Sequence, residues 1–113
     1  MSWWADLKDK NGTILEVPRH SDGGTYVVGG TCEASLNVTY NYGQVFRLVG
    51  LDFWSLNGMN ASDAIPVLEG AVQKLNTKRH EDYWAPTPGN AGYALSILLE
   101  WAMLYPDGVF DVH

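Results

Sequence analysis

Two aromatic residues, two prolines and a Gly-Asn-Ala-Gly run lie together in the segment 81–92. Tyr83 and Trp84 could stack on a nucleobase, a contact worth roughly 1–3 kcal/mol per base. The run that follows predicts the first turn of a helix, whose unpaired backbone N–H groups attract a phosphate or a carboxylate. These N–H groups belong to Asn90, Ala91 and Gly92.

Positive charge lies just upstream, at Lys78, Arg79 and His80. Because this is the one local cluster of positive character in an acidic sequence, it would suit an anionic ligand. Together with the two aromatic residues it predicts a site for a small anion or a nucleotide. The segment is not a P-loop, because the Gly-Lys-Ser/Thr ending and its spacing are missing.

The same segment also has a purely structural interpretation. Thr87 or Asn90 would cap the helix that follows. Tyr83 and Trp84 would then pack as a hydrophobic staple against a pair of helices. The sequence leaves both interpretations open.

A second candidate is the run Thr39-Tyr40-Asn41-Tyr42-Gly43. If the preceding strand continues this far, Tyr40 and Tyr42 share one face and Asn41 points to the other, where it could bind the polar edge of a ligand. The alternative is a strand end with one buried tyrosine and a turn-forming asparagine.

Catalytic and metal-binding signatures are missing from the sequence. His20, His80 and His113 have no metal-ligand spacing, and no serine lies in a Gly-x-Ser-x-Gly elbow. The single Cys32 excludes an internal disulfide and a zinc site built from cysteines. We therefore expect a non-enzymatic protein with no cofactor and no metal.

Thirteen acidic residues against seven basic ones give a net charge of −6. This charge argues against binding to a nucleic-acid backbone, which normally needs a basic patch. It permits a small ligand held by local positive groups, or a partner protein with a basic surface. Neither a membrane span nor a signal peptide is recognisable, so we expect no membrane contact and a cytoplasmic location.

Alternating polar and apolar residues predict an antiparallel β-meander of three short strands. Its strands are expected at 12–17 (ended by Pro18), 25–28 and 33–41. Apolar residues at helical spacing predict helices in the second half of the chain. They are expected at 42–49, from Ser62 or Asp63 to about 76, and at about 90–105, with an edge strand at 109–113.

The predicted fold class is therefore α+β, a short antiparallel β-meander covered by two main α-helices. A length of 113 residues suits a single compact domain, with a β part at about 12–41 and a helical part at about 42–113. Trp3 and Trp4 are expected to pack on this domain or on a second subunit, and we expect a homo-oligomer.

Several short motifs follow one another at a distinctive spacing. They are Thr39-Tyr40-Asn41-Tyr42, Ala64-Ile65-Pro66-Val67-Leu68-Glu69, Asp82-Tyr83-Trp84, Thr87-Pro88-Gly89-Asn90-Ala91 and Tyr105-Pro106-Asp107-Gly108-Val109. In this order they resemble a group of small, mostly uncharacterised proteins encoded by bacteriophages and prophages, over roughly residues 36–112. The group supplies no catalytic residues to carry over.

The resemblance implies a phage accessory factor, and antagonists of host immunity are prominent among such factors. One implied mechanism is a sponge that sequesters a nucleotide-type immune signal of the host. Another is an acidic inhibitor that binds a host defence complex such as a CRISPR effector. Both would act in the cytoplasm of the bacterial host. The third alternative is a structural or assembly protein of the virion.

Overall fold

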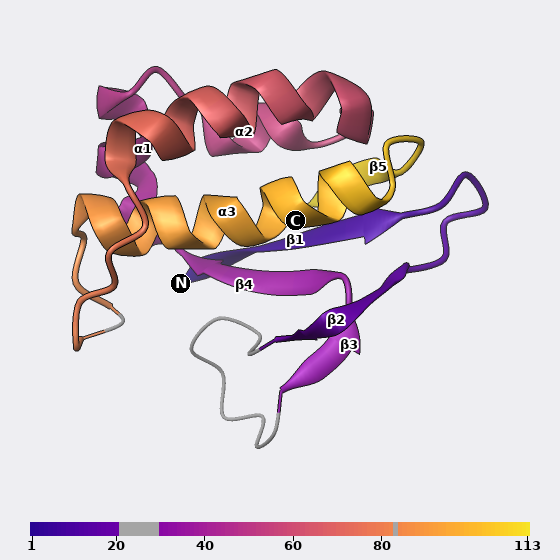
Figure 1. Cartoon of the computed structure of the whole chain (residues 1–113), viewed down its shortest axis with the longest axis horizontal. Helices are drawn as coiled ribbons and strands as arrows, with labels where there is room; N and C mark the ends of the chain where they lie inside the picture. The colour runs from indigo at the N-terminus through magenta and orange to yellow at the C-terminus, as the bar shows by residue number, and fades with distance from the viewer. Residues whose placement is uncertain (21–29, 83) are drawn as a thin grey trace.

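The computed structural model describes residues 1–20, 30–82 and 84–113, and it confirms the predicted α+β class (Figure 1). Its strands are β1 (Ser2–Lys8), β2 (Glu16–His20), β3 (Thr31–Glu33), β4 (Ser35–Thr39) and β5 (Val109–Val112). Its helices are α1 (Gly43–Leu48), α2 (Ala61–Leu75) and α3 (Pro88–Leu104), with 3₁₀ turns η1 (Tyr40–Tyr42) and η2 (Phe53–Leu56).

The strand β1 is the centre of the main sheet, which has the order β4-β1-β5 and is antiparallel throughout. Trp3, Ala5 and Leu7 of β1 belong to the hydrophobic core, whereas Asp6 and Lys8 contact polar residues of the neighbouring strands. The helix α3 lies between this sheet and α2, and β2 and β3 form a separate two-stranded sheet (Figure 1). This central strand is absent from the predicted β-meander.

The predicted strands of the first half differ from the structure in their positions. Residues 9–13 form a turn, and β2 continues through Pro18, which was expected to end a strand. Proline has no N–H to donate, but among the described strands β2 pairs with β3 alone, so one of its edges needs no backbone partner there. The strand predicted at 25–28 lies outside the described residues.

The strand predicted at 33–41 is also divided. β3 ends at Glu33 and β4 ends at Thr39, whose hydroxyl accepts a hydrogen bond from the Asn41 N–H at 3.2 Å. This side-chain cap turns the backbone into η1. The predicted edge strand at 109–113 is confirmed as β5, which pairs with β1 and forms one edge of the main sheet.

The three predicted helices are confirmed, with two differences at their starts. The cap of α2 is Asn60, whose side chain accepts from the Ser62 N–H, rather than Ser62 or Asp63. The cap of α3 is Thr87, one of the two predicted caps, and the helix begins at Pro88. A proline at the first helical position loses no intrahelical hydrogen bond.

The segment after α2 lies directly on the first turn of α3. A β-carbon placed on Gly92 would lie 1.8 Å from the carbonyl oxygen of Asn76, and one on Gly89 would lie 1.7 Å from that of Lys78. Asn76 reverses the chain here with a φ of 69°. Both glycines are therefore needed for the two helices to meet.

We expect Gly92→Ala to lower the free energy of unfolding by about 3 kcal/mol or more, because backbone would have to move to accept the methyl group. The matched control is Gly70→Ala in the interior of α2, where no atom lies within 4 Å of the new β-carbon. There the better helix propensity of alanine should raise stability by about 0.5–1 kcal/mol. Urea denaturation measures both. Equal stabilities for the two variants would contradict the close contact.

Candidate functional site

The side chain of Asn90 fixes the loop that precedes α3. It is only 4% exposed. Its oxygen accepts a hydrogen bond from the His80 N–H at 2.9 Å, and its NH₂ group donates to the carbonyls of Asp82 at 2.9 Å and Ala85 at 3.0 Å. One side chain thus binds three points of the loop.

Two of the three backbone amides proposed to hold an anion, those of Asn90 and Ala91, are engaged inside the protein. The Asn90 N–H donates to the Thr87 hydroxyl at 3.1 Å, and the Ala91 N–H donates to the Thr87 carbonyl at 3.1 Å. Asn90, Ala91 and Gly92 are all buried. The Asn90 and Ala91 amides do not form an open anion site in this structure, because Thr87 accepts both of their hydrogen bonds.

Trp84 lies on the surface of this loop, with 45% of the residue exposed. Its backbone N–H donates to the Asp82 carboxylate at 3.0 Å, and its backbone carbonyl accepts from the Asn41 side chain at 3.0 Å. The two segments singled out in the sequence therefore lie in contact. Tyr83, the other predicted stacking residue, lies outside the described residues.

The predicted positive cluster is spread along the loop. The Lys78 N–H donates to the Asn76 side chain, and the residue is exposed. The Arg79 guanidinium lies over the Tyr93 ring of α3, 4.6 Å from its centroid. This cation–π contact directs the charge of Arg79 toward the side of α3.

Tyr40 and Tyr42 do not share a face, in contrast to the strand-based prediction. Both lie in the 3₁₀ turn η1, which rotates their side chains apart. Tyr42 is fully buried and packs edge-on against Phe46. Tyr40 is 39% exposed and makes a T-shaped contact with Trp3, with ring centroids 4.7 Å apart.

The Trp3 ring contacts a further exposed aromatic residue, Trp54, in addition to Tyr40. Trp54, at 49% exposure, contacts the Trp3 ring edge-on at 6.2 Å, and Phe53 packs below at 4.8 Å. Phe53 thus belongs to the core, whereas the Trp54 side chain lies partly on the surface. The Trp3 indole N–H is buried and has no hydrogen-bond partner among the described residues.

We call Tyr40, Trp54 and Trp84 the aromatic surface. They come from η1, η2 and the loop before α3. The helix α1, which directly follows η1, and this loop both lie at the end of the molecule where α3 begins (Figure 1). Trp54 was not among the site residues predicted from the sequence.

A repeated motif could have identified it. Asp-aromatic-Trp occurs twice, as Asp52-Phe53-Trp54 and Asp82-Tyr83-Trp84. In both copies the Asp carboxylate accepts a hydrogen bond from the backbone N–H of the tryptophan, at 3.1 Å and 3.0 Å. Such a local side-chain turn holds the backbone of each tryptophan.

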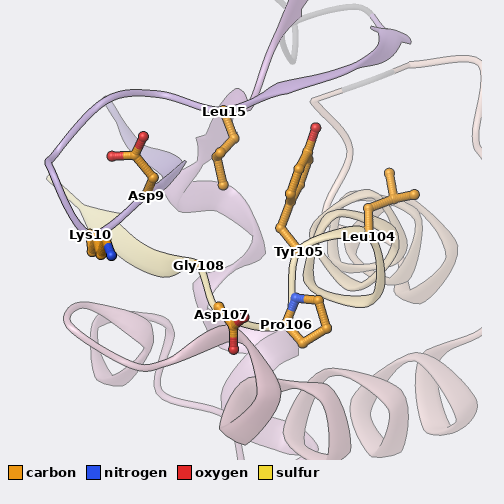
Figure 2. A pocket seen from close by; sticks show the side chains of 8 residues that line it. All are labelled: Asp9, Lys10, Leu15, Leu104, Tyr105, Pro106, Asp107 and Gly108. Carbon is orange, nitrogen blue, oxygen red and sulfur yellow. The ribbon is translucent and has the colours of Figure 1, made fainter.

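A cavity of about 400 Å³ lies at the opposite end of α3, and the sequence patterns did not point to it. Asp9, Lys10 and Leu15 come from the β1–β2 connection, and residues 104–108 come from the end of α3 and the turn into β5 (Figure 2). A smaller hollow of about 180 Å³ lies beside α3, where Arg19 and His20 of β2 approach Tyr93 and Trp101.

Polar side chains also gather on the outer face of the sheet. Asp6, Asp111 and His113 place ligand-type atoms within 4.8 Å of one another, although the histidine spacing had suggested no such group. Asp6 accepts from the Ser35 hydroxyl at 2.6 Å and pairs with His113 at 3.0 Å. Because the carboxylate lies between the serine and the histidine, this is not a Ser-His-Asp triad.

Lys8 already neutralises part of this group. Its ammonium forms an ion pair with Asp111, and this hydrogen bond raises the pKa of Lys8 above its usual 10.5. The lysine therefore stays charged at neutral pH and competes with any cation for the Asp111 carboxylate. A structural role in joining β1 to β5 accounts for these contacts.

No family model, curated protein or solved structure matches this chain. The resemblance to phage-encoded proteins therefore stays a prediction. In the part of the chain that the structure describes, no helix is long and apolar enough to cross a membrane.

We expect Asn90→Ala to lower the free energy of unfolding by about 2–4 kcal/mol, because three backbone groups lose their buried partner. Amide hydrogen exchange across residues 80–85 should accelerate at the same time. The control is Asn41→Ala, which removes one exposed hydrogen bond to the Trp84 carbonyl and should cost less than about 1 kcal/mol. Unchanged exchange in the loop of the Asn90 variant would refute this role.

Proposed function

We propose that this protein is a non-catalytic binding protein whose aromatic surface docks onto a partner protein. The observation that carries the proposal is the pair of half-exposed tryptophans, Trp54 and Trp84, each with its backbone N–H bound by the carboxylate of the aspartate two residues before it. Large aromatic side chains gathered on a surface are typical of interaction sites.

Rigidity makes Tyr40 and Trp54 effective anchors. Tyr40 and Trp54 rest on Trp3, below which the Phe46 and Phe53 rings stack at 5.3 Å. Side chains that are already ordered lose little conformational entropy on binding. Tryptophan and tyrosine are also enriched among the residues that contribute most to interface affinity.

Charge indicates the kind of partner. Asp52 and Asp82 accompany the two tryptophans, and the protein carries a net charge of −6. A partner surface with arginine or lysine would pair with these carboxylates and could stack its cations on the indole rings. Given the resemblance to phage proteins, the partner class we propose is a host defence protein with a basic nucleic-acid channel.

A nucleotide-type ligand is less well supported at this end of the molecule. Trp84 is exposed and could stack on a base. However, the amides of Asn90 and Ala91 have internal acceptors, so a phosphate would lack the fixed donors that the sequence suggested.

Photo-crosslinking tests the docking surface. The protein is expressed in its bacterial host with a photoreactive amino acid at position 54 or 84. A variant with this amino acid at position 103, in place of Met103, is the control. Met103 is 60% exposed and lies near the other end of α3. We expect one protein to crosslink at 54 and 84 but not at 103.

The crosslinked protein is then purified and its affinity measured. Trp54→Ala and Trp84→Ala should each weaken binding about tenfold or more, Met103→Ala should not, and added salt should weaken it further. Thermal unfolding checks that the variants fold. Equal crosslinking at all three positions, or equal affinities of folded variants, would reject the aromatic surface.

A further inference from the structure

We propose that the cavity at the C-terminal end of α3 binds a small organic cation with an apolar body, such as an arylalkylammonium ion. This site is independent of the aromatic surface. The two lie at opposite ends of α3, a helix of 17 residues, and are therefore separated by roughly 25 Å at 1.5 Å per residue.

Hydrogen bonds fix the first wall of the cavity. In the β1–β2 turn, the Asp9 N–H donates to the Thr13 carbonyl at 2.9 Å. The Asp9 carboxylate accepts from the N–H groups of Asn11 and Thr13 at 2.9 and 3.0 Å. Gly12, with a φ of 84°, completes the turn. The position of the Asp9 carboxylate is thus set by the fold.

The second wall is fixed to the first. The Tyr105 hydroxyl donates to the Glu16 carbonyl at 2.5 Å, which ties the end of α3 to the start of β2. The Gly108 N–H donates to the Tyr105 carbonyl at 2.9 Å. A cavity of about 400 Å³ between these walls is therefore preformed, and its volume lies within the range of small-molecule sites.

The interior offers apolar contacts. Leu15 enters from one wall and Tyr105 from the other, with Leu104 and Pro106 beside the ring (Figure 2). Leu104 is 50% exposed although it ends an apolar helix. An aromatic or aliphatic body would cover these side chains and release the water that contacts them.

The charges around the cavity favour a cation. Asp9 and Asp107 contribute two carboxylates against the single ammonium of Lys10, and the described residues form no ion pair with any of the three. The last turn of α3 contains no basic residue to offset the partial negative charge of a helix C-terminus. A phosphate or a nucleotide would be repelled here.

Titration followed by NMR tests this site with three probes of similar shape: 2-phenylethylammonium, neutral 2-phenylethanol and anionic 3-phenylpropionate. The ammonium ion should produce saturable shifts at residues 9–15 and 104–108, and bind about tenfold more tightly than the alcohol. Equal binding of the alcohol, tighter binding of the carboxylate, or no saturable shift at these residues would overturn the proposal.

Charge variants separate the site from the general acidity of the protein. Asp107→Asn should weaken binding of the ammonium ion about fivefold, and Lys10→Gln should strengthen it about threefold. Glu81→Gln makes the same change in net charge in the loop at the other end of α3 and should leave affinity unchanged. Equal losses in the Asp107 and Glu81 variants would show only diffuse attraction and would refute the site.

Discussion

The hydrogen bonds of Asn90 determine the shape of one end of this molecule. Its amide group binds backbone at His80, Asp82 and Ala85, and it does so from a buried position on the first turn of α3. An asparagine side chain offers two donors and one acceptor with two lone pairs, so most of its capacity is used. The loop that presents Trp84 is therefore part of the packed structure. At the same helix start, Thr87 accepts hydrogen bonds from the Asn90 and Ala91 amides, so these two amides have partners inside the protein.

The helix α3 separates two regions of different chemistry. Its N-terminal end adjoins rigid, half-exposed aromatic rings, which suit a large and flat partner surface. Its C-terminal end adjoins a cavity with an apolar interior and two carboxylates, which suits a small cation. Since the glycines of α3 pack directly on the segment after α2, the helix is firmly held between the two regions.

Local patterns predicted the elements whose signals are local. The helical spacing of apolar residues identified α1, α2 and α3, and side-chain chemistry made Thr87 one of the two predicted caps of α3. β1 was missed because its partners, β4 and β5, are distant in sequence. Its tryptophans also lie near the first residue of the sequence, where a chain is expected to fray. The cavity was missed for a related reason: its two turns come together only through the pairing of β1 with β5. The exposure of Trp54 depends on how its ring rests on Trp3, which spacing does not encode.

The position of β1 also has a consequence for the order in which the protein folds. Ala5 pairs with Val112, which is far away in the sequence, so the sheet remains incomplete until Val112 has been synthesised. Contacts between such distant residues form slowly, because a long loop must close before they contribute. Until then one edge of β1 and its apolar residues lack their final cover, which is the kind of surface that chaperones bind on a ribosome-bound chain.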